Sequence, residues 1–459
     1  MNLLFDDIVQ IAHREKINLE EQGREIFTKI STDSRTVDGG EIFVALRGEK
    51  FDGHNFIEQC FEKKIAFAIV DTEWFQNHQN TFAEKKNFKF LVVENTTTAL
   101  AELASVWRRK CDIPVVVIAG SNGKTTTKEM VSRALQTEYN VCSTFSNNNN
   151  IIGVAQTVLS IKKNDEIAVV ELGSNHRGEI ATLVPIAQPT HGIVTNVGKE
   201  HLEYFHTIEN IAKEETTIFT GSVYGFVNSD DEHIVSHSVK LEKKITYGFD
   251  GSAVVSGRIR NYSDGGCAII EIPKFAMNIT LQIPGKHNAY NALAAVTIGN
   301  HFGIHSKNIQ DALENFTAYN KRSQTERIGF ITVINDTYNA NPDSAISALQ
   351  TLQQFKTEGK KIIVFGDMLE LGTSSADEHS LIGKKIAEMN FEYLFGYGTY
   401  SKETIHAARI VYAEHFSSKK ELSEQLISMI SPNDVVLIKG SRGMRMEEIV
   451  EELRTYFKH

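Results

Sequence analysis

A short stretch of the chain carries most of its chemical information. Residues 119–127 read Ala-Gly-Ser-Asn-Gly-Lys-Thr-Thr-Thr, after the apolar run 115–118 and before the helix-like segment 128–135. A buried strand, a glycine-rich turn and a helix N-terminus together form an anion-binding site, because glycines let the backbone approach and the helix dipole adds positive potential. The stretch therefore predicts a phosphate-binding loop. The alternative is a tight turn that binds nothing.

The side chains of this loop indicate which phosphates it binds. Lys124 would reach the β- and γ-phosphates of a nucleotide, and the hydroxyl of Thr125 or Thr126 would hold Mg²⁺. The loop is a shortened variant, because Ile118 occupies the position where the eight-residue P-loop pattern has glycine. We predict a nucleoside triphosphate site whose ATP-binding loop residues are Gly120, Ser121, Asn122, Gly123, Lys124, Thr125 and Thr126.

Two later apolar runs lead to groups that could hold a metal. Glu171 ends the run 168–171, and His201 lies shortly after the run 192–195. A carboxylate at the carboxyl end of a strand beside a P-loop is where a Mg²⁺ ligand belongs, and an imidazole there has a metal or phosphate role. The alternatives are a surface acid and a structural histidine. The amides of residues 147–150 either point into the same cleft or form an ordinary polar loop.

The elements that must position these groups alternate in type along the chain. Short apolar strands are separated by helical stretches, and continuous apolar strands are typical of parallel sheets covered on both faces. We predict an α/β fold of three domains: residues 1–95, a central P-loop domain with a parallel sheet at 96–314, and a Rossmann-like domain at 315–459. Ligands are expected at the carboxyl ends of the strands.

Composition narrows the functional classes. The 459 residues carry a net charge of −10, which disfavours nonspecific nucleic-acid binding because polyanions require a basic surface. Four scattered cysteines without CxxC spacing suit a reducing cytoplasm and argue against a zinc cluster. The amino terminus lacks the basic segment of a signal peptide, and no apolar run approaches the ~18 residues of a membrane span. We expect a cytoplasmic protein that does not insert into membranes.

The order of several short motifs resembles the Mur ligase family along essentially the whole chain. In that family the phosphate loop usually begins with threonine, so Ala119 is a mild departure. Each motif is weak alone, but their order is specific. The motifs beyond the loop lie at residues 147–154, 171–180, 196–203, 285–292, 335–342, 366–372 and 439–441.

The resemblance implies roles around ATP and two Mg²⁺ ions. Lys124 and Thr125 would bind the ATP phosphates and Mg²⁺, and Glu171 and His201 would complete the metal shell.

Further along the chain, the resemblance implies contacts to the nucleoside. Adenine would lie near Asn288 and Asn291, and the ribose near Asp336. Arg322 would approach the nucleotide when the domains close, although Lys321 stands where the family usually has glycine.

The helix after the histidine motif departs from the family. Many relatives carry there a lysine that CO₂ carbamylates and that holds the second Mg²⁺. Aligning residues 211–219 on the shared Ile-Ala and Ile-Phe flanks places Glu215 at that position, with Lys213 about 200° away around the helix. Carbamate and glutamate both present acceptor-only oxygens. We predict that Glu215 supplies the anion directly; the alternative is a solvent-facing acid.

The resemblance also implies the reaction, an ATP-dependent amide-bond formation through an acyl phosphate. The motifs at 336–342 and 366–368 look like the branch that adds D-alanyl-D-alanine to UDP-N-acetylmuramoyl-tripeptide. The Asp-Asn-Pro-Arg signature of amino-acid-adding relatives is absent from the sequence. The implied catalytic residues are Lys124, Glu171, His201 and Glu215, and the implied substrate-binding residues are Ser34, Arg47, His54, Asn149, Asn150, Asn339, Asn341, Asp367 and Lys439.

Several alternatives stay open. Without the family, surface charge explains Arg47 and a turn explains His54, while Asp367 and Lys439 are equally a strand-end turn aspartate and a helix-end lysine. The nearer alternative function is another amide ligase, either an amino-acid-adding Mur ligase or a folylpolyglutamate synthase; the motif over residues 32–54 disfavours the folate enzyme. The more distant one is a P-loop ATPase without ligase activity. We expect a monomer whose partners are its small-molecule substrates.

Overall fold

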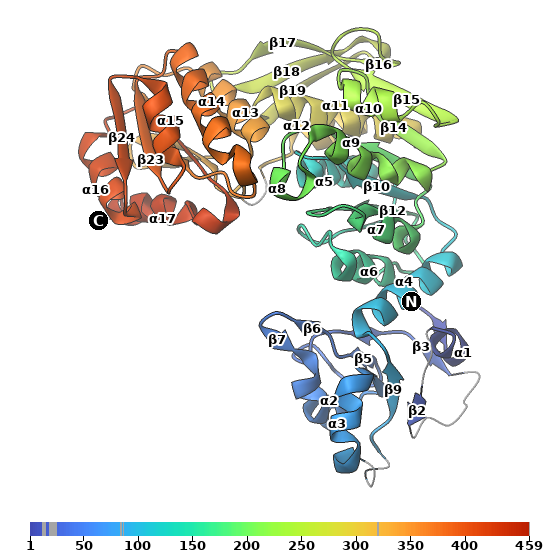
Figure 1. The fold of residues 1–459 in the computed structure, drawn as a ribbon. Coiled ribbons are helices and arrows are strands. Elements are labelled where there is room, and N and C mark those ends of the chain that lie inside the picture. Colours follow the sequence, from blue (N-terminus) through green and yellow to red (C-terminus); the bar gives the residue numbers. More distant parts are fainter. Residues whose placement is uncertain (12–14, 18–24, 83–84, 86, 319–320, 459) are drawn as a thin grey trace. The chain divides into compact units, whose positions relative to one another are not determined.

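The computed structural model describes residues 1–11, 15–17, 25–82, 85, 87–318 and 321–458. Its helices and mostly parallel sheets confirm the predicted α/β class (Figure 1). Among these residues no helix is both long and apolar enough to cross a membrane. By their contacts the residues form two compact units: residues 1–117, 139–173 and 180–191, and residues 118–138, 174–179 and 192–459. The division into three domains stays a prediction.

The first unit contains a five-stranded sheet in the order β2-β9-β8-β5-β4. Four of its strands are parallel, and β2 pairs antiparallel with β9. An aromatic core that includes Phe43, Trp74 and Phe90 packs against the sheet. The elements span Glu15–Ile17 (β2), Ile30–Ser31 (β4), Ile42–Val44 (β5), Ile57–Glu62 (α2), Phe67–Asp71 (β8), Thr72–Phe82 (α3) and Phe90–Val93 (β9).

The sheet that carries the phosphate loop has seven strands in the order β11-β12-β10-β13-β14-β15-β16. Every residue of β10 and β12 is buried, as expected for apolar strands inside a sheet covered on both faces. The pairs β11–β12, β14–β15 and β15–β16 are parallel. The strands span Val115–Ala119 (β10), Val141–Ser143 (β11), Ile167–Glu171 (β12), His191–Val194 (β13), Tyr224–Asn228 (β14), Lys243–Gly248 (β15) and Val255–Ser256 (β16).

A three-stranded antiparallel sheet in the second unit is absent from the sequence-based expectations. It consists of β17 (Arg258–Tyr262), β18 (Cys267–Ile272) and β19 (Met277–Pro284). Buried and exposed side chains alternate along β19, which is the signal of a half-buried strand and is weaker than a continuous apolar run. The sheet leads into α11 (Lys286–His301).

The last sheet is doubly wound, as predicted, in the order β20-β21-β25-β22-β23-β24. Its strands are parallel except the edge strand β20. Ile363 packs with residues of α13 and α14, whereas its neighbour Ile362 packs with residues of α16 and α17, so helices cover both faces (Figure 1). The elements span Gln324–Ile328 (β20), Ile331–Asp336 (β21), Pro342–Gln354 (α13), Lys361–Gly366 (β22), Ser375–Glu388 (α14), Tyr393–Tyr397 (β23), Tyr412–Phe416 (β24), Lys419–Met429 (α16), Val435–Lys439 (β25) and Glu447–Tyr456 (α17).

Arg108 ties the end of α4 (Thr96–Lys110) to other segments of the first unit. The residue is 6% exposed. Its guanidinium donates hydrogen bonds of 2.6–3.2 Å to the carbonyls of Cys111, Ile113, Ala187 and Gln188. Because Ile113 lies just before β10, this side chain helps to fix the start of the strand that ends at the phosphate loop.

We predict that Arg108→Met destabilises the protein. Removing the guanidinium leaves buried carbonyls without donors, at a cost of about 3 kcal/mol in the free energy of unfolding. Thermal unfolding followed by circular dichroism should show a melting temperature lower by at least about 5 °C. The matched control is Arg109→Met, one residue on and exposed, which should shift the melting temperature by less than ~2 °C. Equal melting temperatures for the two variants would contradict this role.

Candidate active site

The predicted phosphate loop joins β10 to α5 (Lys124–Leu135), and its geometry requires two glycines. Gly120 and Gly123 have φ angles of 119° and 81°, which residues with side chains rarely adopt. A Cβ on Gly120 would lie 2.3 Å from Oγ1 of Thr195, and a Cβ on Gly123 would lie 2.7 Å from Oδ1 of Asn291. The strand–loop–helix arrangement is therefore present, with glycine where the backbone needs it.

The segment after β13 holds this loop in shape. The N–H of Ser121 donates to the carbonyl of Asn196 (2.9 Å), and the N–H of Asn122 donates to Oδ1 of Asn196 (3.1 Å). The Thr195 hydroxyl donates to the carbonyl of Asn122 (2.7 Å), and the N–H of Gly198 donates to Oγ of Ser121 (2.8 Å). These loop N–H groups are used within the protein, so a phosphate would meet the N–H groups of the first turn of α5.

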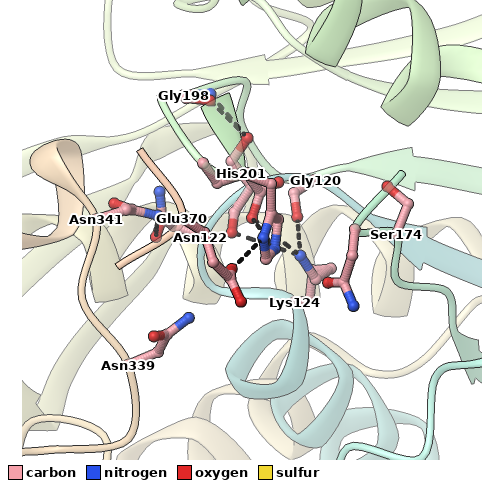
Figure 2. A network of polar contacts seen from close by, with 12 residues as sticks. Gly120, Asn122, Lys124, Ser174, Gly198, His201, Asn339, Asn341 and Glu370 are labelled. Atoms are coloured by element: carbon pink, nitrogen blue, oxygen red, sulfur yellow. Dashed lines mark hydrogen bonds and ion pairs between the residues drawn. The ribbon is translucent and has the colours of Figure 1, made fainter. Parts of the chain in front are cut away.

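Lys124 is folded over its own loop. Its Nζ donates to the carbonyl of Gly120 (2.5 Å) and lies 3.7 Å from Oε2 of Glu200 (Figure 2). Glu200 is a site residue that the sequence analysis missed; its one signal is its place beside His201. It is 6% exposed, and burial raises the pKa of its carboxyl to about 7, although the charge of Lys124 lowers it.

Glu215 lies beneath the phosphate loop, on α9 (Ile208–Thr216). Its side chain is fully buried; Oε2 accepts from the N–H of Gly120 (2.5 Å) and Oε1 from the hydroxyl of Ser174 (3.1 Å). Lys213, two residues earlier on the helix, is 63% exposed and lies 3.9 Å from Glu209. The helix therefore directs Glu215 and not Lys213 to the loop, as the spacing predicts.

His201 lies in a left-handed turn after β13, with a φ angle of 48°. Its Nδ1 lies 2.5 Å from Oε2 of Glu370, and its Nε2 lies 3.9 Å from Oε2 of Glu200 (Figure 2). Burial lowers the pKa of His201, but the hydrogen bond to Glu370 and the charges of both carboxylates outweigh it, so the pKa is raised. A carboxylate on Nδ1 turns Nε2 toward the loop, which is how proteins orient metal-binding histidines.

The segment around α13 also contacts the phosphate loop. Nδ2 of Asn341 donates to Oδ1 of Asn122 (2.9 Å), while Oδ1 of Asn341 accepts from the N–H of Ser344 and caps α13. The N–H of Lys199 donates to Oδ2 of Asp343 (2.6 Å). Both contacts place the N-terminus of α13 beside the nucleotide loop.

Asp336 and Lys439 form an ion pair at the carboxyl ends of β21 and β25. Nζ of Lys439 donates to Oδ2 of Asp336 (2.6 Å) and to the carbonyl of Asn339 (2.9 Å), and Lys439 is 2% exposed. Burial raises the pKa of Asp336, but the charge of Lys439 lowers it further, so the pKa falls below its usual value. These contacts favour a structural role for Lys439, because its ammonium group is already bonded to Asp336 and to the carbonyl of Asn339.

Asp367 has a similar structural role. Its carboxylate accepts hydrogen bonds of 2.7–3.0 Å from the N–H groups of Thr399, Tyr400 and Ser401 and caps the N-terminus of α15 (Ser401–Ala408). The residue is 3% exposed. The turn-aspartate alternative therefore fits its contacts.

The predicted nucleoside contacts lie on α11, just before β20 and at the end of β21. Nδ2 of Asn291 donates to Oδ1 of Asn288 (3.0 Å), and Oδ1 of Asn291 accepts from the hydroxyl of Thr127 on α5 (3.0 Å). Both asparagines are buried. The guanidinium of Arg322 lies 3.6 Å above the ring of Tyr338. The contact to adenine and the approach of Arg322 to the nucleotide stay predictions.

In the first unit, the asparagine run meets the predicted metal carboxylate. Nδ2 of Asn149 donates to Oε1 of Glu171 (2.9 Å), and Glu171 is 1% exposed. Oδ1 of Asn150 accepts from the N–H of Gly153 (3.0 Å) and caps α6 (Ile151–Leu159). Asn149 thus orients Glu171, and Asn150 starts a helix.

The predicted UDP-binding residues differ in exposure. Arg47 is half-exposed and lies within 3.0–3.4 Å of carboxylate oxygens of Asp52, Asp71 and Glu73. The side chain of His54 is fully buried, with Nδ1 2.6 Å from Oδ1 of Asp52 and Nε2 accepting from the N–H of Asp71 (3.2 Å).

Ser34 is 5% exposed, and its carbonyl accepts from Nζ of Lys63 (2.8 Å). Of the three predicted UDP-binding side chains, Arg47 is the most accessible to a ligand.

Within the described part of the chain, no group of three or more histidine, cysteine or acidic side chains is arranged to hold a metal ion. Mg²⁺ usually combines one or two protein carboxylates with phosphate oxygens and water, so such a cage is not needed in a nucleotide site. The loop, Lys124, and the buried carboxylates of Glu200 and Glu215 instead form a site suited to a phosphate chain with its cation.

Comparison with known proteins agrees with this geometry. Three family models match: Mur ligase family, catalytic domain (residues 26–108), Mur ligase middle domain (118–299), and Mur ligase, glutamate ligase domain (321–442). The chain is 33% identical to the UDP-N-acetylmuramoyl-tripeptide–D-alanyl-D-alanine ligase of Bacillus subtilis, over 92% of each chain.

Solved structures match over almost the whole chain as well. Crystal structure I of MurF from Acinetobacter baumannii has a TM-score of 0.88 at 28% identity and covers 99% of each chain. The MurF ligase from Thermotoga maritima in complex with ADP has a TM-score of 0.82 at 25% identity, covering 94% of this chain and 98% of that one. The resemblance inferred from the motifs is confirmed: the chain belongs to the Mur ligase family.

Proposed function

We propose that the protein is an ATP-dependent ligase that joins D-alanyl-D-alanine to UDP-N-acetylmuramoyl-tripeptide in peptidoglycan precursor synthesis. The observation that carries the proposal is the similarity over 92% of the chain to the UDP-N-acetylmuramoyl-tripeptide–D-alanyl-D-alanine ligase of Bacillus subtilis. A glycine-rich loop with Lys124 at the N-terminus of α5 supports ATP as the energy source, as does the ADP complex of the Thermotoga neighbour.

This reaction asks the protein for positioning and charge stabilisation. A free carboxylate is a poor acyl donor, because its leaving group would be oxide. Transfer of the γ-phosphoryl group to the tripeptide carboxylate releases ADP and gives an acyl phosphate. The dipeptide amine then attacks the carbonyl, phosphate leaves, and the nitrogen loses a proton. Lys124 and the N-terminus of α5 would stabilise the phosphate charge.

Mg²⁺ fits the side chains present. In the second unit, Thr125, His201 and Glu215 offer the oxygen and imidazole ligands of a hard divalent cation, and Thr125 and Glu215 are buried beside the loop. Glu171, in the first unit, stays a predicted ligand. The cation would neutralise charge on the β- and γ-phosphates. We propose two ions.

The proposed anion for the second ion is Glu215 itself. A carboxylate has about four lone-pair sites, and the two hydrogen bonds to Gly120 and Ser174 leave others for a cation. A glutamate carries its own carboxyl group, so no CO₂ is needed to form the acceptor. A carbamylated lysine would be unnecessary in this chain.

The proposed division of labour follows the predicted domains. Residues 1–95 would hold the UDP end through Ser34, Arg47 and His54, and residues 96–314 would hold ATP. Residues 315–459 would bring the amine, and Asn339 and Asn341 are the predicted contacts there. A cytoplasmic location and a monomeric state stay predictions.

Phosphate release from Mg–ATP tests the function. With UDP-N-acetylmuramoyl-tripeptide and D-alanyl-D-alanine supplied separately and together, we expect release that needs both. Mass spectrometry should detect the UDP-linked pentapeptide.

Two outcomes would contradict the proposal. Release with the dipeptide-bearing precursor and a free amino acid would move the protein to the amino-acid-adding branch. Release that needs neither substrate would indicate a plain P-loop ATPase.

Substitution of Glu215 tests the carboxylate assignment. We expect Glu215→Ala to lower the rate at least about 100-fold, because an anion that orders both the loop and the cation is lost. Glu215→Lys should be inactive without bicarbonate and partly recover with it, through carbamylation. Lys213→Ala is the matched control on the exposed side of α9 and should keep the wild-type rate. Full activity of Glu215→Ala would show the assignment to be wrong.

A further inference from the structure

Glu200 has a carboxylate oxygen whose needs the described residues do not meet. The residue is 6% exposed, and Oε1 is buried without a hydrogen-bond partner in the described part of the chain. Oε2 lies 3.7 Å from Nζ of Lys124 and 3.9 Å from Nε2 of His201, so both contacts exceed hydrogen-bond length. The hydroxyl of Ser121 hydrogen-bonds the carboxylate, but Oε1 stays unpaired among the described residues. Buried polar groups are almost always paired, so Oε1 points to a missing partner.

The charged groups around Glu200 indicate that the missing partner is positively charged. Glu215 is a second buried carboxylate at the same loop, but its oxygens accept from Gly120 and Ser174. Lys124 is the nearest cation, and the phosphates of a bound nucleotide would draw it away from Glu200. The carboxylate would then face a polyanion. Buried charges are paired or coordinate metals, and a cation between the carboxylate and the phosphates would balance both.

The geometry suits a cation shared with His201. Two ligands of one octahedral Mg²⁺, at bond lengths of about 2.1 Å, lie about 3.0 Å apart when adjacent and about 4.2 Å apart when opposite. The 3.9 Å between Oε2 of Glu200 and Nε2 of His201 lies between these two spacings, so a small shift of either side chain would bring the pair to one of them. Nδ1 of His201 is engaged by Glu370, which leaves Nε2 facing Glu200. Phosphate oxygens and water would complete the shell.

We propose that Glu200 is a ligand of the nucleotide-bound Mg²⁺ and shares that ion with Nε2 of His201. The inference rests on the proposed function only in that the chain binds a magnesium nucleotide. It adds a metal ligand that the family resemblance does not assign.

Mn²⁺ is a suitable probe, because it occupies Mg²⁺ sites and is detected by electron paramagnetic resonance. The full chain is titrated with Mn²⁺ in the presence of a non-hydrolysable ATP analogue, without peptide substrates. For Glu200→Gln, which keeps the side-chain size, we expect the dissociation constant of Mn²⁺ to rise at least about 10-fold. Affinity for ADP in EDTA should be unchanged or slightly tighter, because Lys124 loses a competing anion.

Two further variants sharpen the test. Glu203→Gln removes an exposed carboxylate three residues on and should leave Mn²⁺ affinity at the wild-type value. Glu200→Asp keeps the charge and should bind Mn²⁺ more tightly than Glu200→Gln.

The inference is overturned if Glu200→Gln binds Mn²⁺ as the wild type does. It is also overturned if that variant loses ADP affinity in EDTA by the same factor, since Glu200 would then act through the loop alone. A wild-type chain that binds Mn²⁺ and nucleotide at Glu200 but makes no amide would keep the inference and remove the ligase proposal. A wild-type chain that binds no nucleotide would remove both.

Discussion

The hydrogen bond from the N–H of Gly120 to the buried carboxylate of Glu215 is the contact on which the site depends. It places a buried carboxylate beneath a loop that is built to bind anions, so a cation is needed on the other side of the loop. Lys124 supplies part of that positive charge, and in the structure it does so while folded onto the carbonyl of Gly120. The loop is thus shaped by α9 and the segment after β13, and its lysine and helix N-terminus remain for the phosphates.

The same loop is where the last third of the chain meets the central sheet. Asn341 reaches Asn122, and Glu370 reaches His201, so two residues of the nucleotide site are each held by a side chain from the doubly wound sheet. A bound nucleotide would alter Lys124 and its neighbours directly. Through these contacts, a movement of Lys124 and its neighbours on nucleotide binding would shift the part of the chain that is proposed to bind the amine.

Much of this arrangement is visible in the sequence, for identifiable reasons. Continuous apolar runs such as 115–118 and 168–171 indicated buried parallel strands, because a strand buried on both faces has no polar face to interrupt the pattern. The loop was found because its glycines and lysine have fixed spacing. The sheet β17–β19 was not predicted because its strands are half exposed, and alternation over a few residues is a weaker signal of a strand than a continuous apolar run.

The features of the site that the sequence did not predict depend on contacts between residues far apart in the chain. The sequence indicated a strand-end turn for Asp367 and wrongly a helix end for Lys439, which is the last residue of β25. Only the fold reveals that Lys439 pairs with Asp336 and that Asp367 caps α15. Glu200 was not predicted because its burial follows from a turn at His201 that no local sequence pattern encodes.

The central claim, that this loop binds the nucleotide phosphates through Lys124, is tested most directly by a crystal structure with Mg²⁺ and a non-hydrolysable ATP analogue. The account predicts that Nζ of Lys124 leaves the carbonyl of Gly120 for the β- and γ-phosphate oxygens at the N-terminus of α5. A nucleotide bound elsewhere, with Lys124 still on that carbonyl, would contradict it.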